Sequence, residues 1–220
     1  MLVEVWSDVV CPWCYIGKRR FAAATAELAA DPTFGAQIEV VYRPYQLDPN
    51  APVGTTMPVL DAYARKFGGP ERAQRIVDDI TRLAAAEGLD FHLERARRAN
   101  TRDAHRVLWF AETHGPAGAQ AELKERLLAA YFIEGRNVGD HDVLVAEAAA
   151  AGLDADAVRG MLDGTEGLGE IAELLAFARD AEIAAVPTYV IDRRWSIPGA
   201  QDPAVFVQVL RRLAATERAG

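Results

Sequence analysis

Two cysteines stand three residues apart in the segment Cys11-Pro12-Trp13-Cys14, and the chain contains no others. On the first turn of a helix this spacing brings two sulfurs within bonding distance. Pro12 suits the first helical position, where its missing N–H costs nothing. The segment therefore predicts reversible dithiol–disulfide chemistry.

The two sulfurs are expected to play different parts. Cys11 faces the free N–H groups and the positive dipole end of the following helix, which favour the thiolate and lower the pKa below the ordinary value of about 8.5. We therefore expect Cys11 to be the nucleophile. Cys14 lies one turn further in and is expected to attack the mixed disulfide. Trp13 is either a stacking surface for substrate or partly buried.

A half zinc site is the alternative interpretation of the cysteine pair. Zinc would need two further ligands, and structural zinc sites commonly contain two ligand pairs. The remaining candidates show no paired spacing: His92, His105, His114 and His141. The sequence therefore favours redox chemistry and predicts no metal.

A second segment that could do chemistry is Val186-Pro187-Thr188, which precedes a late strand pattern. The bond before a proline can be cis, and a cis bond here would present the Val186 backbone to an extended substrate. The substrate could then add as a short strand and bring its own cysteine onto Cys11. The alternative is a trans proline that begins an edge strand.

The elements that must position these residues are strands at both ends of the chain. Residues 2–7 and 38–42 are β-branched runs on either side of a helical pattern, which predicts a parallel β-α-β unit. Residues 188–192 and 195–197 predict two further strands before a final helix. From residue 55 to 181 strand patterns vanish, and capped helical segments follow one another.

The predicted fold class is thus an α/β domain interrupted by a large all-helical insertion. We expect the α/β domain to comprise residues 1–54 and 182–220, with the insertion at 55–181 between them. Asp140 and Asp154 are expected to begin helices of the insertion. Glycines are expected to stop helices at three positions: Gly135, Gly152 and Gly164.

The composition excludes several classes of protein and partner. Lys and Arg number 24 and Asp and Glu 32, so the net charge of −8 has the wrong sign for nucleic-acid or anionic-membrane binding. No uncharged apolar run approaches the ~18 residues of a membrane span, and the first residues carry no positive region. We expect a cytoplasmic protein without a nucleic-acid or membrane partner.

Taken together, these segments resemble the DsbA family, specifically its FrnE-like cytoplasmic branch. The resemblance spans nearly the whole chain. It implies a thioredoxin fold with a DsbA-like helical insertion, thiol–disulfide exchange at Cys11 and Cys14, and a cis Val186–Pro187 bond. Residues 182–185 stand where relatives usually carry glycines. The segments that carry the resemblance are residues 8–19, 42–47, 100–101, 104–106, 130–132, 186–190 and 199–201.

Four further side chains are secondary candidates. Lys18 could add positive potential near Cys11 or grip a glutathione carboxylate, and the alternative is a solvated helix face. His105 could shuttle a proton if its helix covers the cysteines, and the alternative is a packed, hydrogen-bonded histidine. Glu4 and Asp8 share one face of the first strand. The sequence does not say whether that face is buried, so neither is counted as catalytic.

The leading function is a thiol–disulfide oxidoreductase or isomerase that acts on protein or small thiol substrates through Cys11 and Cys14. We expect no tightly bound cofactor, with glutathione as a candidate reductant or co-substrate. One rival is a glutathione-dependent isomerase or transferase of the kappa or 2-hydroxychromene-2-carboxylate isomerase type, a branch that usually has Ser at the first motif position. Another is a peptide-binding chaperone clamped by its redox state.

Overall fold

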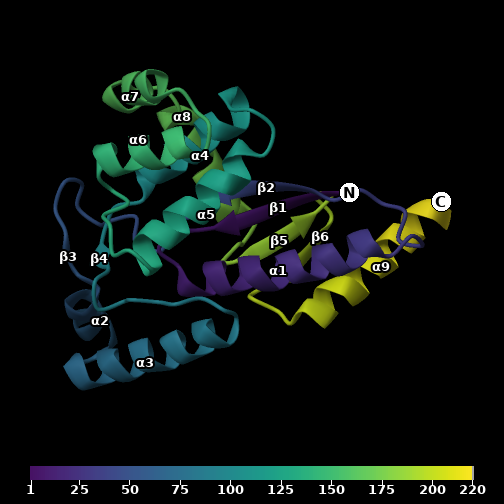
Figure 1. The fold of residues 1–220 in the computed structure, drawn as a ribbon, viewed down its shortest axis with the longest axis horizontal. Helices are drawn as coiled ribbons and strands as arrows, with labels where there is room; N and C mark the ends of the chain where they lie inside the picture. Colours follow the sequence, from purple (N-terminus) through teal and green to yellow (C-terminus); the bar gives the residue numbers. More distant parts are fainter. Residues whose placement is uncertain (220) are drawn as a thin grey trace.

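A four-stranded mixed sheet forms the centre of the computed structural model, which describes residues 1–219 (Figure 1). The strand order is β2-β1-β5-β6. β1 and β2 are parallel, β5 runs antiparallel to β1, and β6 runs antiparallel to β5. The parallel β-α-β unit is confirmed, and the late strands make the sheet mixed. The bounds are β1 Leu2–Ser7, β2 Glu39–Pro44, β5 Thr188–Ile191 and β6 Trp195–Pro198.

Two helices cover one face of this sheet, α1 (Pro12–Ala30) and α9 (Pro203–Ala219). They run side by side in Figure 1. Between them and the sheet, the rings of Phe21, Tyr189 and Phe206 lie 4.7–5.1 Å apart between centroids. These contacts form an aromatic core directly beneath the C-terminal hairpin.

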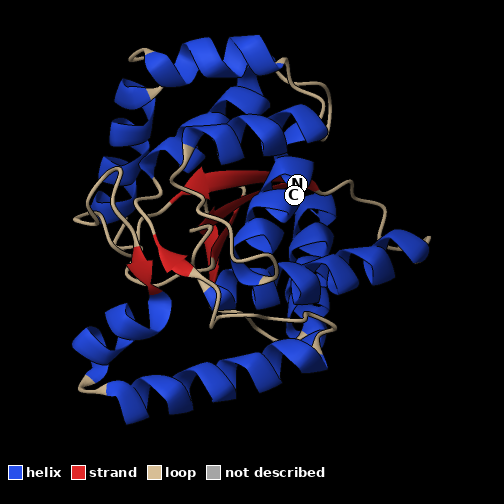
Figure 2. Ribbon diagram, turned by 60° about the vertical axis from the view of Figure 1, so that its left-hand side comes forward, coloured by secondary structure: helices blue, strands red, loops and turns tan. Residues whose placement is uncertain are grey.

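The segment between β2 and β5 is mainly helical, as predicted, and Figure 2 shows its helices around the rest of the sheet. Helices α4, α5 and α8 pack against β2. Helices α2 and α3 pack on one another and lie apart from that group. The bounds are α2 Val59–Phe67, α3 Pro70–Ala86, α4 Arg102–His114, α5 Ala119–Phe132, α6 His141–Ala150, α7 Ala155–Asp163 and α8 Leu168–Asp180.

The predicted helix ends are confirmed in this segment. The Asp140 carboxylate accepts hydrogen bonds from two backbone N–H groups of α6, and Asp154 accepts one in α7. These side chains satisfy donors that the first helical turn leaves free. Gly135, Gly152 and Gly164 each follow the end of a helix, α5, α6 and α7 respectively.

The absence of strands from residues 55–181 was predicted wrongly. Two-residue strands β3 (Met57–Pro58) and β4 (Arg97–Arg98) pair antiparallel across α2 and α3. Two residues are too few to show the alternating pattern by which strands are found. The pairing joins the two ends of the segment that contains α2 and α3.

The helical segment does not have a core of its own. Tyr15 and Ile16 of α1 are buried in the same apolar cluster as residues of α4 and α5. The Tyr15 ring lies 5.7 Å from Phe91, which stacks at 4.5 Å on Phe132. The division at residues 54 and 181 therefore stays a prediction, because packing crosses it. In the described residues, no helix is both long and apolar enough to span a membrane.

Gly17 is the point at which α1 approaches the segment around Pro187. A Cβ at this position would lie 2.8 Å from the Tyr189 hydroxyl and 2.9 Å from Pro187 Cγ. We expect Gly17→Ala to lower the free energy of unfolding by about 1–3 kcal/mol, because a methyl group is forced into a filled contact. Denaturant titration measures this change.

The matched control is Gly160→Ala in α7, where an added Cβ has nothing within 4 Å. There the helical preference of Ala is expected to raise stability by about 0.5–1 kcal/mol. Equal effects of the two substitutions would contradict the close approach at Gly17.

Candidate active site

The cysteine pair lies where β1 ends and α1 begins. Cys11 occupies the N-cap position of α1 with φ −93° and ψ 115°, and Pro12 follows it in the first turn. The Cys14 N–H donates to the Cys11 carbonyl oxygen at 3.0 Å. The first turn contains no acidic residue. Cys11 thus faces the positive end of the helix, as predicted.

Both sulfurs are free thiols and both are buried, with residue exposures of 2% for Cys11 and 3% for Cys14. They pack in a small apolar cluster with Trp6, Val186 and Ala178 of α8. Trp13, between them in sequence, is 42% exposed. The Trp13 ring is therefore accessible to solvent, whereas both sulfurs are buried.

The segment Val186-Pro187-Thr188 lies against Cys11. The Val186–Pro187 bond is cis, as the family resemblance implies. The Cys11 thiol donates to the Val186 carbonyl oxygen at a distance of 3.6 Å. Thr188 donates its hydroxyl to the Ala185 carbonyl at 2.8 Å. The structure therefore brings together the two segments that the sequence marked for chemistry.

The pKa of Cys14 is raised well above the ordinary thiol range. Burial is the largest cause, and a hydrogen bond and electrostatic interaction with Cys11 add to it. Lys124 and the backbone N–H of Asp8 act in the opposite direction. Cys14 therefore keeps its proton in the reduced protein, as a resolving thiol should.

Asp8 is fully buried between the cysteines and the helical segment. Its carboxylate accepts hydrogen bonds from the N–H groups of Val9 and Leu47, both at 2.8 Å. His105 Nε2 lies 3.1 Å from the same carboxylate and 2.9 Å from the Tyr45 carbonyl oxygen. A carbonyl only accepts, so Nε2 carries the proton.

His105 and Lys18, two of the four secondary candidates, have partners other than sulfur. His105 is buried and hydrogen-bonded to Asp8, so an effect on the cysteines has to pass through that carboxylate. The Lys18 ammonium forms an ion pair with Glu125 at 2.5 Å. A glutathione carboxylate would have to compete with Glu125 for it. Glu4 is also buried and pairs with Arg43 at 2.8 Å.

Lys124 is the site residue that sequence reasoning missed. It is 1% exposed on α5, and its Nζ donates to the Ser7 carbonyl oxygen at 3.5 Å. Burial lowers its pKa to about 8, while Cys14, Asp8 and Cys11 raise it. In the sequence it stands beside Glu125 in a mixed helical pattern, which is typical of a solvated face.

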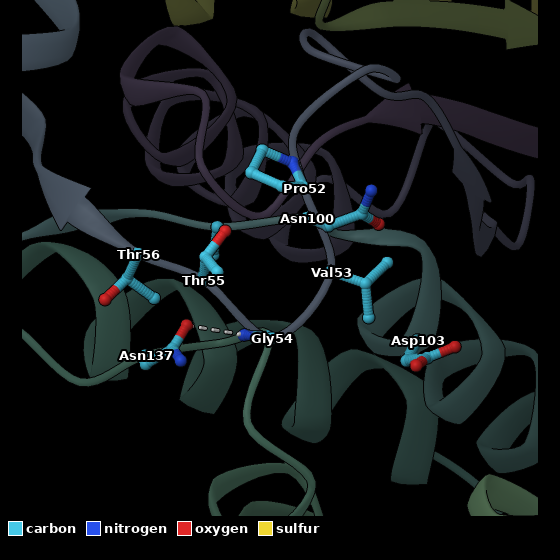
Figure 3. Close-up of a pocket in the computed structure, with 10 residues that line it drawn as sticks. Pro52, Val53, Gly54, Thr55, Thr56, Asn100, Asp103 and Asn137 are labelled. Carbon is cyan, nitrogen blue, oxygen red and sulfur yellow. Dashed lines mark hydrogen bonds between the residues drawn. The ribbon is translucent and has the colours of Figure 1, made fainter.

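Two hollows in the described part of the chain are lined by residues other than the cysteines. A small one, drawn in Figure 3, lies between residues 52–56, the start of α4 at Asp103 and the loop at Asn137. Its volume of about 10 Å³ has room for about one water molecule. An open groove of about 410 Å³ borders Thr188 and runs between α8 and the β5–β6 hairpin. In the described residues, no three His, Cys, Asp or Glu side chains gather as a metal site.

Fold and site together define a dithiol protein of the thioredoxin class, with a helical insertion between the cysteine helix and the proline segment. The chain belongs to the DsbA-like thioredoxin domain family, which it matches over residues 2–211. The predicted DsbA-like thioredoxin fold is therefore confirmed.

Known proteins of this type include close and distant relatives. A probable DsbA oxidoreductase from Streptomyces coelicolor is 37% identical, with a TM-score of 0.86 over 99% of this chain and 91% of its own. YwbO of Bacillus subtilis, uncharacterised, is 28% identical over 94% of each chain. The cytosolic disulfide reductase DsbM of Pseudomonas aeruginosa, solved with glutathione, is 19% identical and covers both chains fully with a TM-score of 0.63. That last likeness shows the fold alone.

Replacing Lys124 by Met is expected to stabilise the protein at pH 7. Burial lowers the pKa of Lys124 to about 8, so the folded protein carries a buried charge below about pH 8. This buried charge lowers the free energy of unfolding. The unfolded lysine titrates near pH 10.4, so wild-type stability from this group rises between about pH 8 and pH 10. The advantage of Lys124→Met should be up to ~3 kcal/mol at pH 7 and shrink through that window.

Chemical denaturation at several pH values measures this difference. The control is Lys66→Met, because Lys66 is exposed on α2 and its replacement should change stability by less than ~0.5 kcal/mol. A loss of stability at pH 7 in Lys124→Met alone would contradict a destabilising buried charge.

Proposed function

We propose that the protein is a thiol–disulfide oxidoreductase in which Cys11 attacks and Cys14 resolves. The observation that carries this proposal is the placement of Cys11, which occupies the N-cap position of α1 and whose thiol donates to the Val186 carbonyl oxygen. Cys14 lies buried behind it with a raised pKa. The Cys11 sulfur thus lies at the Val186 segment, where we place the substrate, and the Cys14 sulfur is buried until the second displacement.

The proposed reaction has two displacement steps. The Cys11 thiolate bonds to one sulfur of a substrate disulfide, the substrate S–S bond breaks, and the other sulfur leaves and takes up a proton. Cys14 then attacks Cys11 Sγ, the Cys11–Cys14 disulfide forms, and the first substrate sulfur leaves. The substrate gains two electrons and the pair loses two. Two thiols such as glutathione would reduce the pair again, and the reverse order introduces a disulfide.

The Val186 carbonyl supports binding of an extended substrate. In the reduced protein it accepts the Cys11 thiol proton. Once Cys11 is a thiolate or belongs to a disulfide, that donor is gone and the carbonyl is free to accept a substrate N–H. The substrate class in this proposal is a protein or small-molecule disulfide, held through its backbone. Trp13, exposed beside the pair, offers an apolar contact.

Glutathione and a cytosolic location complete the proposal. Both are suggested by the description of DsbM as a cytosolic disulfide reductase solved with glutathione. Membership of the FrnE-like branch rests on the sequence segments alone. No tightly bound cofactor is needed, because the two cysteines carry both electrons.

Insulin reduction with glutathione or dithiothreitol tests this function in wild type, Cys11→Ser and Cys14→Ser. We expect loss of activity in both variants by about a hundredfold or more, because each step needs its own sulfur. Mixed disulfides should accumulate only in Cys14→Ser, where nothing displaces the adduct. Mass spectrometry detects them.

Other outcomes would select a rival function. A glutathione-dependent isomerase would retain activity on a small aromatic substrate in Cys14→Ser, since that reaction needs one activated sulfur. A redox-clamped chaperone would suppress aggregation equally well after both cysteines become serine. Adducts trapped on Cys14 in Cys11→Ser would reverse the roles assigned here.

His105 is proposed to act by holding Asp8 in place. We therefore expect His105→Gln to keep the pH profile of insulin reduction and to change its rate by no more than about threefold, because proton transfer by a positioned side chain contributes about a hundredfold or more. The steady-state rate between pH 5.5 and 8.5 measures this. A profile that loses a step in His105→Gln would show that the imidazole itself transfers a proton.

A further inference from the structure

The open groove of about 410 Å³ lies on the sheet face that α1 and α9 do not cover. Thr188 and Val190 of β5 line it, since the alternate residues of that strand are buried beneath α1 and α9. Residues 181–185 form another wall. These residues flank Val186, whose carbonyl oxygen accepts the Cys11 thiol proton. One end of the groove therefore lies at the cysteine site.

A second hollow, of about 490 Å³, continues the first between the sheet and the helices α4 and α8. Three residues line both hollows: Glu4, Phe177 and Arg193. The two hollows therefore adjoin each other, and we call them together the sheet groove. It extends from the segment before Val186 to the facing sides of α4 and α8.

The far end of the sheet groove has aromatic walls. Trp6 of β1, Trp109 of α4, and Leu174 and Phe177 of α8 line it. The rings of Trp6 and Phe177 are stacked with 5.6 Å between their centroids. The Phe177 side chain is nevertheless 53% exposed. A large aromatic surface that remains open to solvent beside a hollow is typical of a binding site.

Two of the carboxylates at this end are neutralised by neighbours. Glu4 forms an ion pair with Arg43 at 2.8 Å. Glu112 accepts two hydrogen bonds from Arg43 at 2.9 Å and one from the Gln120 carboxamide at 3.3 Å. The same carboxamide accepts from the Tyr42 N–H at 2.9 Å and donates to the Tyr42 carbonyl at 3.0 Å. These contacts hold Glu112 at the wall of the groove.

Two further carboxylates at this end have no partner of opposite charge. Glu170 and Glu173 of α8 are exposed and, within the described residues, form no ion pair. Their spacing with Leu174 and Phe177 places all four side chains on one face of the helix. Four carboxylates and two guanidinium groups line this hollow, which leaves two negative charges. The far end of the sheet groove is thus both aromatic and acidic.

The register of the sheet gives the distance between this end and the cysteines. Glu4 lies opposite Val190 in the pairing of β1 with β5. Val190 is four residues beyond Val186, which is roughly 13 Å in an extended chain at ~3.3 Å per residue. A substrate chain that starts at Val186 and follows β5 therefore reaches Glu4 after about four residues.

We propose that the sheet groove binds the polypeptide on one side of a substrate cysteine and selects an arginine or lysine about four residues from that cysteine. This inference rests on the proposed function, since it names the substrate of the same site. A basic side chain fits the far end because its apolar stem can lie on the aromatic walls, aromatic faces attract cations, and the two free carboxylates supply the opposite charge.

Short uncharged peptides with one cysteine linked to thionitrobenzoate test this selection. The members of each pair carry either arginine or its uncharged isostere citrulline, four and five residues before the cysteine in one pair and after it in the other. The Cys11 thiolate bonds to the peptide sulfur, the S–S bond breaks, and thionitrobenzoate leaves as a coloured thiolate. The rate of its release measures how well each peptide is bound for attack.

We expect a preference of about fivefold or more for arginine over citrulline in one of the two pairs. The measurement is made in 0.5 M salt, where long-range attraction by the net charge of −8 is screened. In the double variant Glu170→Gln, Glu173→Gln the preference should fall to within about twofold. The matched control is Glu71→Gln, Asp78→Asn, which removes two exposed charges of α3 outside the groove and should keep the wild-type preference.

Equal rates with arginine and citrulline in both pairs would overturn the proposal, as would a preference that survives the double substitution at the groove. A structural defect in that variant would slow both peptides of a pair and leave their ratio as it is in wild type, which also counts against the proposal. Release of thionitrobenzoate from none of the peptides by the wild type would instead refute the proposed function, on which this inference rests.

The tryptophan indole resonances locate the bound peptide by NMR. Trp6 and Trp109 line the far hollow and Trp195 lines the near one, whereas Trp13 belongs to the cysteine motif. Addition of the preferred arginine peptide, with serine in place of its cysteine, should shift the resonances of all three groove tryptophans. Shifts confined to Trp13 would show that the peptide follows another path. Shifts that appear on concentrating the protein without peptide would show that a second copy of the chain occupies the groove, and either result would overturn the proposal.

Discussion

The antiparallel pairing of β1 with β5 is the constraint on which the site depends. It places Trp6 opposite Thr188, so the chain leaving β1 and the chain entering β5 meet at the same end of the sheet. Cys11 and Val186 are 175 residues apart in sequence and are brought into contact there. A long connection is tolerated because the cost of loop closure rises only slowly with length. The helical segment can therefore be large, provided that it returns the chain to this register.

That segment also completes the chemistry of the thioredoxin domain. The end of β1 supplies Asp8, α1 supplies the sulfurs, and the insertion supplies His105 and Lys124. Burial raises the pKa of Cys14 and lowers the pKa of Lys124.

The chemistry of the site was predictable where local sequence determines it. The cysteine spacing, the proline at the helix start and the aspartate caps act within a few residues, and the structure places them as expected. The contact between Cys11 and Val186 followed from the family resemblance, because no local pattern joins residues so far apart. The direction of the late strands and the two-residue strands β3 and β4 depend on tertiary pairing. Lys124 and Gly17 were missed for the same reason, since their neighbours come from β1, β2 and the Pro187 segment.

The contact of Gln120 with Tyr42 has a further consequence for how the molecule behaves at high concentration. β2 is an outer strand of the sheet, and an outer strand offers unpaired N–H and C=O groups to other chains. The carboxamide occupies one such pair near the middle of the strand, and α5 lies over it. A second molecule that tried to extend the sheet at this edge would have to displace both hydrogen bonds and the helix that carries them. The same side chain that holds Glu112 at the wall of the groove therefore also protects the sheet against edge-to-edge aggregation.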